Sequence, residues 1–391
     1  MDALIEPSGV NTLLQQAGRQ LGIESVQLPD ALGRWLANDI IADRDQPPYD
    51  RSMMDGYAVC GTGPRWQVVG RTWAGQPVSE DPLDEGEAIE IMTGAPVPPD
   101  ADAVVPYEWT QRDKQTLTMN SIHSLTAGQF IHAQASDAPA GRVLIPAQAR
   151  LGLPEMGVAA AVGAVALSVV RRPRVHLLTT GDEVMPVHLA PATHQVRQSN
   201  RAVLEALLRA HGAEVESSHL IDDADMIRRW LEASRSADLI VVVGGMSRGQ
   251  RDFLPRLLDG MGRCLFHGVA QKPGKPLGAW QVDGGPLALG LPGNPLSVLA
   301  AATRYLVPLL ALLETGRWPE PMHVPLIEPV ETMPQATRLI PVRLEAGRAR
   351  PLAFQNSGDF AAAVGATGVV EIARGGMPPA QEGVPYYPFL R

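Results

Sequence analysis

The stretch from residue 238 to 243 reads Asp-Leu-Ile-Val-Val-Val, an almost unbroken run of apolar and mostly β-branched side chains. Such a run is typical of a strand covered on both faces, as the strands of parallel sheets are. Strand-like and helix-like segments alternate around it between residues 173 and 317, which predicts a three-layer α/β domain with a mostly parallel sheet. Strands are expected at 175–178, 215–220, 238–243, 264–269 and 287–289, and helices at 200–211, 224–234 and 295–313.

The chain of 391 residues is too long for this domain alone, so further domains are expected. Residues 47–145 contain short strand-like runs between Gly, Pro and Asp, and residues 318–391 return to that pattern, which predicts two small β domains. Residues 146–172 are interpreted as a return to the segment 1–46, so that the first β domain is inserted into a helical one. Within 1–46, helices are predicted at 8–20 and 29–41.

Composition excludes several classes of function. The formal charge of −9 argues against a general binder of nucleic acid or of an anionic membrane. Two cysteines far apart in the chain give neither a disulfide framework nor a metal cluster, so a cytoplasmic location is expected, and the first residues lack the pattern of a signal peptide. The chain has 30 Arg and three Lys, yet Lys272 and Lys275 lie in one short segment. This favours a local need for a compact positive charge.

Polar and charged turns follow four of the predicted strands, at 179–183, 244–252, 270–276 and 290–295. In a parallel sheet such turns meet at one edge, where ligands bind. Backbone N–H groups of a glycine-rich turn and two lysines suit an anion, and nearby carboxylates suit the Mg²⁺ that accompanies phosphate. The residues predicted to form this anion and cation site are Gly244, Gly245, Ser247, Gly249, Lys272, Lys275, Asp182, Glu183 and Asp252.

Each of these motifs also has a simpler interpretation as a tight turn, a solvated acid or a surface charge, and only their joint position favours a site. A second polar cluster, with Ser52, Asp55 and Thr93, lies in the inserted β domain, where turn-stabilising roles are equally compatible with the sequence. The histidines and cysteines show no zinc-ligand spacing, and neither a nucleophile elbow nor a dinucleotide-binding glycine motif is present.

The motifs resemble, in order and over almost the whole chain, those of the molybdopterin molybdenumtransferase family of molybdenum cofactor synthesis, which is related to the C-terminal domain of gephyrin. The segments that carry the resemblance are Ser52-x-Met54-Asp-Gly-Tyr-Ala58, Thr93-Gly-Ala-Pro-Val-Pro98, Thr180-Gly-Asp-Glu183, Ser199-Asn200, Gly244-Gly-x-Ser-x-Gly249 with Asp252, Lys272-Pro-Gly-Lys-Pro276 and Leu291-Pro-Gly-Asn-Pro295.

The resemblance implies a Mg²⁺-dependent reaction in which adenylated molybdopterin and molybdate give molybdenum cofactor and AMP. It also implies an elongated homodimer of four-domain subunits, in which 1–46 with 146–172 forms the dimerisation domain. The site would lie between the α/β domain of one subunit and the inserted β domain of the other. Molybdopterin adenylyltransferase and recipient molybdoenzymes are the further partners that it suggests.

Residue roles follow from the same resemblance. Asp55, Glu183 and Asp252 would hold Mg²⁺ or water, and Lys272 and Lys275 would bind molybdate or phosphate. The implied substrate-binding residues are Ser52, Thr93, Asp137, Gly244, Gly245, Ser247, Gly249, Pro276, Pro292, Asn294, Pro295 and Ser357.

The chain departs from the family pattern at three positions near the predicted site. Gln250 and Gln198 stand where acidic residues are usual, and Arg248 stands where a small apolar residue is usual. One carboxylate fewer weakens the predicted Mg²⁺ site. A non-catalytic paralogue that binds the pterin as a carrier or chaperone therefore stays open. A molybdopterin adenylyltransferase is the second alternative, because the α/β domain also resembles that related group through Gly244-Gly and Arg251-Asp252.

Overall fold

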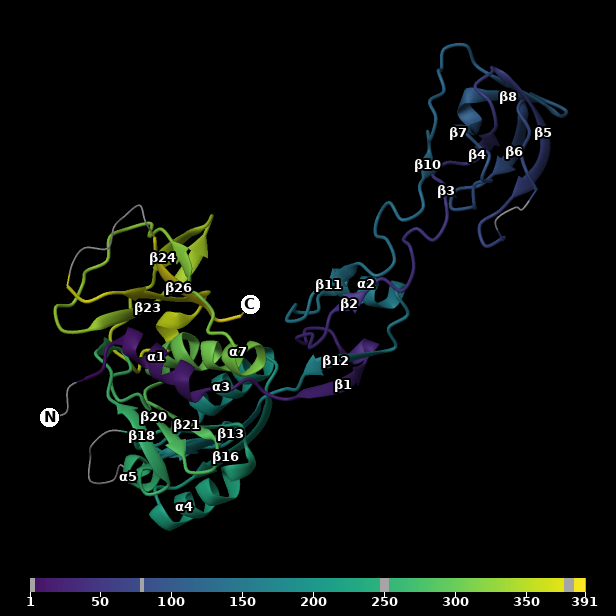
Figure 1. The fold of residues 1–391 in the computed structure, drawn as a ribbon. Helices are drawn as coiled ribbons and strands as arrows, with labels where there is room; N and C mark the ends of the chain where they lie inside the picture. Colours follow the sequence, from purple (N-terminus) through teal and green to yellow (C-terminus); the bar gives the residue numbers. More distant parts are fainter. Residues whose placement is uncertain (1–3, 78–80, 247–252, 376–382, 391) are drawn as a thin grey trace. The chain divides into compact units, whose positions relative to one another are not determined.

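The computed structural model describes residues 4–77, 81–246, 253–375 and 383–390. It divides into two compact units, one formed by the chain up to Glu24 and from Val170 onward, the other by Ser25–Val169. The first unit contains an α/β sheet and a second, C-terminal sheet, and the second unit contains the inserted β domain (Figure 1). The multidomain architecture of α/β and β parts predicted from the sequence is therefore confirmed.

The α/β sheet of the first unit has six strands in the order β16-β13-β17-β21-β20-β18. The pairs β16–β13, β13–β17 and β17–β21 are parallel, whereas β20 runs antiparallel to both of its neighbours. Consequently β13, β16, β17, β18 and β21 all end at the same edge of the sheet, as the sequence predicts for four of them. The strands are β13 (Arg174–Thr180), β16 (Glu214–Leu220), β17 (Leu239–Val243), β18 (Gly262–His267), β20 (Gly278–Val282) and β21 (Leu287–Leu291).

Helices cover both faces of this sheet. The odd-numbered residues of β17 pack with α1, α3 and the helix that follows β21, and its even-numbered residues pack with α4 and α5. All five residues of β17 are buried, as the apolar run predicts. The helices are α1 (Pro7–Ala17), α3 (Ser199–Ala210), α4 (Ala224–Ala233) and α5 (Leu254–Asp259).

The helix after β21 is long and apolar. It comprises α6 (Pro295–Ala301), a π-helical turn η4 (Ala302–Leu306) and α7 (Val307–Thr315), and it ends at Gly316 in the left-handed conformation. By length and composition Pro295–Thr315 would be able to span a membrane, but 89% of its apolar window is buried inside the structure. It therefore serves as the central core helix.

The C-terminal sheet takes one of its strands from the α/β part of the chain. Its order is β19-β23-β25-β26-β22, with β24 paired to β23, and β19 (Gln271–Lys272) lies between β18 and β20 in the sequence. The two sheets are thus joined at the segment that contains Lys272. The other strands are β22 (Met322–Val324), β23 (Thr337–Glu345), β24 (Arg348–Pro351), β25 (Gly368–Ile372) and β26 (Val384–Pro388), with a short 3-10 helix η5 (Ala361–Ala363).

The second unit contains a six-stranded sheet in the order β7-β4-β6-β5-β9-β8. Its strands are β4 (Gly56–Val59), β5 (Arg65–Thr72), β6 (Glu87–Ile91), β7 (Ala103–Pro106), β8 (Thr110–Asp113) and β9 (Thr116–Met119), with a 3-10 helix η2 (Tyr107–Trp109). The unit also contains the pairs β2 (Ile40–Ile41) with β11 (Val143–Ile145) and β3 (Arg51–Ser52) with β10 (Ile131–His132), together with η1 (Leu28–Asp30) and α2 (Leu153–Ala161). The pair β1 (Ile23–Gln27) with β12 (Ala166–Val170) belongs to it except for Ile23, Glu24 and Val170, which fall in the first unit.

The prediction of a helix over 29–41 is wrong. Only a 3-10 turn forms there, and the following residues bridge other segments: Trp35 pairs with Arg150 and Leu36 with Val169. The burial of Leu36 among strands decides its conformation, because tertiary packing overrides a periodicity that four apolar residues set only weakly. The predicted first helix exists as α1, but it begins at Pro7 and packs against the α/β core rather than against residues 146–172.

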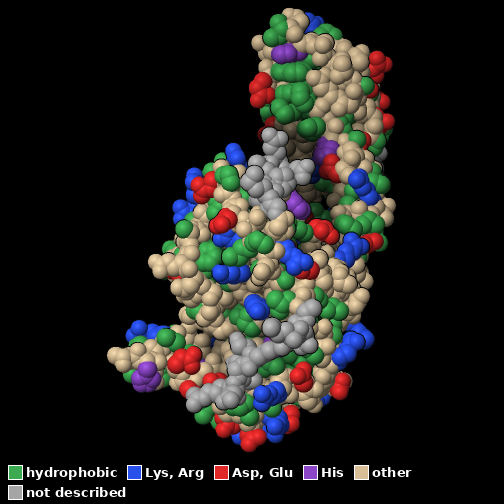
Figure 2. Space-filling view, turned by 90° about the vertical axis from the view of Figure 1, so that its left-hand side faces the viewer, with side chains coloured by type: hydrophobic (Ala, Val, Ile, Leu, Met, Phe, Trp, Pro, Cys, Tyr) green, Lys and Arg blue, Asp and Glu red, His purple; other side chains and the backbone are tan. Residues whose placement is uncertain are grey.

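Acidic and basic side chains are interspersed over the face of the molecule that Figure 2 shows. No broad field of positive charge is visible among the coloured side chains of that face, and the composition has an excess of acids over bases. A site for an anion must therefore gather its positive charge locally.

Candidate functional site

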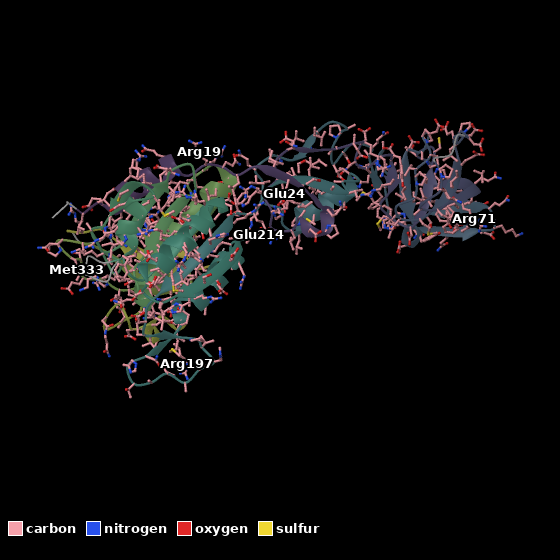
Figure 3. All side chains as sticks on the ribbon, turned by 90° about the horizontal axis from the view of Figure 1, so that it is seen from below. Arg19, Glu24, Arg71, Arg197, Glu214 and Met333 are labelled. Atoms are coloured by element: carbon pink, nitrogen blue, oxygen red, sulfur yellow. The ribbon has the colours of Figure 1, made fainter. Side chains whose placement is uncertain are left out.

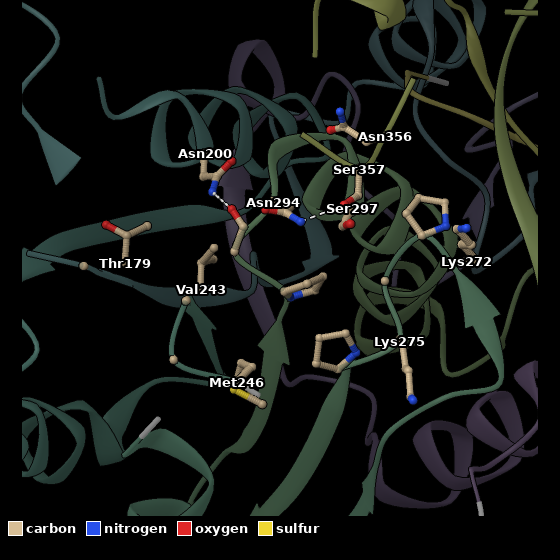
Figure 4. A pocket seen from close by; sticks show the side chains of 18 of the residues that line it. Thr179, Asn200, Val243, Met246, Lys272, Lys275, Asn294, Ser297, Asn356 and Ser357 are labelled. Carbon is tan, nitrogen blue, oxygen red and sulfur yellow. Dashed lines mark hydrogen bonds between the residues drawn. The ribbon is translucent and has the colours of Figure 1, made fainter. Parts of the chain in front are cut away.

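A pocket of about 820 Å³ opens at the edge of the α/β sheet where the strands end, and the C-terminal β domain forms one of its sides. Residues that follow β13, β16, β17, β18 and β21 line it, together with Met333, Arg338 and the segment 354–357. Figure 4 shows Lys272 and Lys275 on one side of this pocket and Thr179 and Asn200 on the other. Met333 is labelled at one edge of the first unit in Figure 3.

The cationic side of the pocket is built by the segment between β18 and β20, which we call the lysine loop (residues 268–277). Lys272 pairs with Arg338 in the parallel ladder between β19 and β23, so both side chains project from the same face of the sheet. Both line the pocket with Lys275, and both lysine side chains are exposed. A bound anion would be attracted by all three positive charges.

The acidic side of the pocket contains Glu183, after β13, and Asp222, after β16. The Asp222 backbone N–H donates to Asp182 Oδ1 at 3.0 Å, which brings a third carboxylate beside them. Burial raises the pKa of Asp222, and the charges of Asp182 and Glu183 act in the same direction. Negative charge is therefore costly at this point, and a cation would stabilise it.

Two hydrogen bonds fix the side of the pocket that lies between α3, α6 and the C-terminal domain. Asn200 Nδ2 donates to the carbonyl of Gly293 at 2.7 Å, and Asn294 Nδ2 donates to Ser357 Oγ at 2.6 Å (Figure 4). Gln198 caps α3, because its side-chain oxygen accepts from the Arg201 N–H at 3.4 Å. The amide that replaces the expected acid thus still supports the helix that carries Asn200. The segment that precedes it, with Arg197 in β15 (Val196–Arg197) paired to β14 (Val184–Met185), projects from the unit (Figure 3).

The second polar cluster forms in the other unit. Asp55 Oδ1 accepts hydrogen bonds from the backbone N–H and from Oγ1 of Thr93, both at 2.7 Å. These bonds, the backbone one first, lower the pKa of Asp55. Ser52 is buried and donates to the Met54 carbonyl at 2.6 Å, and Asp137 contacts His132 Nε2 at 2.8 Å. Asp55 and Thr93 therefore form one preorganised pair, whereas Ser52 stabilises a turn.

The residues predicted from the sequence fall into three groups. The pocket brings together Glu183, Gly244, Gly245, Lys272, Lys275, Pro276, Pro292, Asn294 and Ser357, while Pro295 begins α6 beside it and Asp182, which does not line it, accepts from the Asp222 N–H. Asp55, Thr93, Ser52 and Asp137 belong to the other unit. Ser247, Gly249 and Asp252, with Arg248 and Gln250, lie outside the described residues. Within the described ranges, no three Asp, Glu, His or Cys side chains gather to hold a metal ion.

Sequence reasoning missed Asp222, Arg338 and Asn200 as residues that line the pocket. Asp222 had a usable signal, since it follows a predicted strand just as Glu183 does. Arg338 had none, because its place depends on the pairing of β19 with a strand from the C-terminal domain in the register Lys272–Arg338.

Two family models match the chain, the MoeA N-terminal region (domains I and II) over residues 8–163 and a probable molybdopterin binding domain over residues 176–312. The molybdopterin molybdenumtransferase of a Synechocystis species is 32% identical, over 94% of this chain and 95% of its own length. The chain belongs to the molybdopterin molybdenumtransferase family. The Haemophilus influenzae member of that family is 31% identical over 80% of this chain and 78% of its own length.

A solved structure agrees with this membership. The molybdopterin biosynthesis MoeA protein from Pyrococcus horikoshii is 29% identical, covers 99% of both chains and superposes with a TM-score of 0.82. The molybdopterin molybdenumtransferase family assignment thus holds for the sequence and for the fold.

Proposed function

We propose that this chain is a molybdopterin molybdenumtransferase, which inserts molybdate into adenylated molybdopterin and releases AMP. The observation that carries the proposal is the pocket that Lys272, Lys275 and Arg338 line together with Glu183 and Asp222. The cationic side would hold the oxyanion or the phosphate. Release of AMP breaks the phosphoanhydride between the adenylate and the molybdopterin phosphate, with water as the acceptor. This step needs positioning and charge stabilisation but no covalent bond to the protein.

Mg²⁺ is the cation that we propose for the acidic side. Mg²⁺ typically binds through one or two carboxylates together with substrate phosphates and water, and Glu183 and Asp222 provide such a pair. The raised pKa of Asp222 supports this fit, because a cation would relieve the unfavourable negative charge there. When bound, the ion would neutralise the negative charge of the phosphates. The sequence-based ligands Asp55 and Asp252 stay proposals.

The test is AMP release by the purified full chain from adenylated molybdopterin, molybdate and Mg²⁺. Lys275→Gln removes one cationic donor and is expected to lower kcat/KM about a hundredfold, the usual scale for losing one stabilising group. Lys114→Gln is the matched control, since Lys114 lies in the β8–β9 turn and does not line the pocket. Equal rates for the wild type and both variants would contradict the proposal.

The same assay separates the two alternatives. Tight binding of the pterin without AMP release would identify a carrier, and consumption of ATP with metal-free molybdopterin would identify an adenylyltransferase. In either outcome the transferase proposal would be abandoned.

We further propose a cytoplasmic homodimer that exchanges its pterin with molybdopterin adenylyltransferase and with recipient molybdoenzymes, as the family resemblance implies. Light scattering of the purified chain checks the dimer, for which twice the monomer mass of 41.9 kDa is expected. Cell fractionation checks the location.

A further inference from the structure

The buried side chain of Tyr305, which does not itself line the pocket, is connected to the lysine loop by hydrogen bonds. Tyr305, in the π-helical turn η4, is fully buried and donates a hydrogen bond from its hydroxyl to Gln271 Oε1 at 2.5 Å. Gln271 is also buried, and its Nε2 donates to the carbonyl of Gly274 at 3.2 Å. Two successive hydrogen bonds thus connect the core helix, through Gln271, to the middle of the loop.

The hydrogen bond from Gln271 reaches the loop at Gly274, where the backbone is tightly constrained. Gly274 lies between Lys272 and Lys275 with a φ of +98°, and a Cβ there would approach Gln271 Nε2 to 2.8 Å. The Gly274 carbonyl also accepts from the Leu277 N–H at 3.2 Å, and the Val269 N–H donates to the Lys275 carbonyl at 2.9 Å. The Gln271 amide therefore fixes the point about which both lysines are arranged.

The tyrosine is suited to hold this amide in one orientation. Burial raises the pKa of Tyr305, so its hydroxyl stays protonated and remains a donor. With the hydroxyl on Oε1, the NH₂ group of Gln271 must face Gly274. Loss of the hydroxyl would leave Oε1 as a buried acceptor without this donor, and the amide would be free to rotate away from the loop.

We propose that Tyr305 is a positioning residue: through Gln271 it holds the lysine loop in the geometry that binds the oxyanion. This inference rests on the proposed function, because the oxyanion is the molybdate of that reaction. Tyr305 acts without touching the substrate, which separates it from the pocket residues described above.

The chain supplies a closely matched control for the substitution Tyr305→Phe. Tyr387 is also buried and packs against the same guanidinium, with Arg304 Cζ 4.5 Å from its ring centre and 4.7 Å from that of Tyr305. Its hydroxyl contacts Glu371 Oε2 at 3.4 Å rather than the loop. Tyr387→Phe therefore removes a similarly buried hydroxyl without affecting Gln271.

The experiment measures kcat and KM for molybdate, together with amide hydrogen exchange, in the full chain. Tyr305→Phe is expected to lower kcat/KM for molybdate about tenfold, mainly through KM, as a small displacement of a binding group does. The Val269 and Leu277 amides should exchange faster in Tyr305→Phe than in Tyr387→Phe. Gln271→Met should produce the same defect, and adding Tyr305→Phe to it should cause no further loss.

Equal KM values and equal exchange in Tyr305→Phe and Tyr387→Phe would overturn the inference, as would strictly additive effects of Tyr305→Phe and Gln271→Met. If the wild type released no AMP, the proposed function would fail instead. The exchange comparison would then still decide whether Tyr305 fixes the loop.

Discussion

Gly244 is the residue at which β17 turns into the pocket, and its backbone admits no side chain. Its φ is +94°, and a Cβ would lie 2.8 Å from the carbonyl oxygen of Thr180 on the neighbouring strand. The close approach lets the ends of β13 and β17 meet at the pocket that both residues line. A glycine is required here both by conformation and by space.

Gly244→Ala is expected to destabilise the chain by about 2–3 kcal/mol, since backbone strain and a clash with a carbonyl add together. Gly284→Ala is the control, because Gly284 has a φ of +60° but no atom lies within 4 Å of the point that its new methyl group would occupy. The free energy of unfolding of that variant should fall by only about 1 kcal/mol, because only the backbone conformation is unfavourable there. Denaturant unfolding of both variants checks the difference, and equal losses would contradict it.

Thr93 controls the charge of Asp55 through two hydrogen bonds, of which Thr93→Val removes the one from Oγ1. The pKa of Asp55 should rise in that variant but stay below its usual value, because the backbone bond has the larger effect. Since the folded-state pKa is lowered, the stabilisation from Asp55 exists above its unfolded pKa and is lost as the pH falls through the folded one. NMR titration of the Asp55 carboxyl provides the measurement. An unchanged pKa would show that the hydroxyl bond does not form in solution.

At the scale of single residues, the sequence predicts which charged side chains belong to a site better than it predicts which residues contact one another in the fold. Lys275 and Glu183 are recognisable because charged residues follow strands that end at one sheet edge. Tyr305 gives no such signal, because an apolar helix favours burial of the ring and says nothing about where its hydroxyl points. Its role depends on the tertiary contact with Gln271.

At the scale of elements, the segment between β12 and β13 is anchored by a paired charge. Arg171 donates to both carboxylate oxygens of Asp238 at 2.6 and 2.5 Å, and the Arg174 N–H donates to the same carboxylate at 2.8 Å. Although burial of Asp238 acts in the opposite direction, these bonds lower its pKa. They connect the chain entering the α/β sheet to the residue that precedes β17.

Arg171→Met is expected to lower the free energy of unfolding by about 2 kcal/mol at neutral pH. This loss is smaller than for a fully buried ion pair, because Arg171 is partly exposed. The lowered pKa makes this stabilisation present above the unfolded pKa of Asp238, so the difference from wild type should shrink below about pH 4. The neighbouring Arg172 gives the control, Arg172→Met. Unfolding measured at both pH values checks the prediction, and a pH-independent difference would refute it.

Elements defined by strong local patterns are predicted well, whereas elements defined by distant partners are not. The buried run of β17 and the helix that ends at Gly316 follow directly from local sequence. The segment 29–41 does not, because Trp35 and Leu36 obtain their partners from residues far along the chain, Arg150 and Val169. The two-residue strand β19 escapes prediction for the same reason.

At the scale of the whole molecule, two units with separate cores are expected to unfold in two steps. Leu177→Ala, in the α/β core, and Leu117→Ala, in the inserted β domain, each remove a fully buried side chain at a cost of about 3 kcal/mol. Scanning calorimetry should show each substitution lowering a different transition. A single transition lowered by both would mean that the units unfold together.

Residues 271 and 272 of β19 pair with residues 337 and 338, which are synthesised later. The pocket therefore cannot be completed until those later residues have been made. A nascent chain emerges from the ribosome with both loop lysines already made, yet the strand that flanks one of them has nothing to pair with until those later residues appear. The pocket is consequently among the last parts to be completed during translation, after much of the α/β sheet is able to fold.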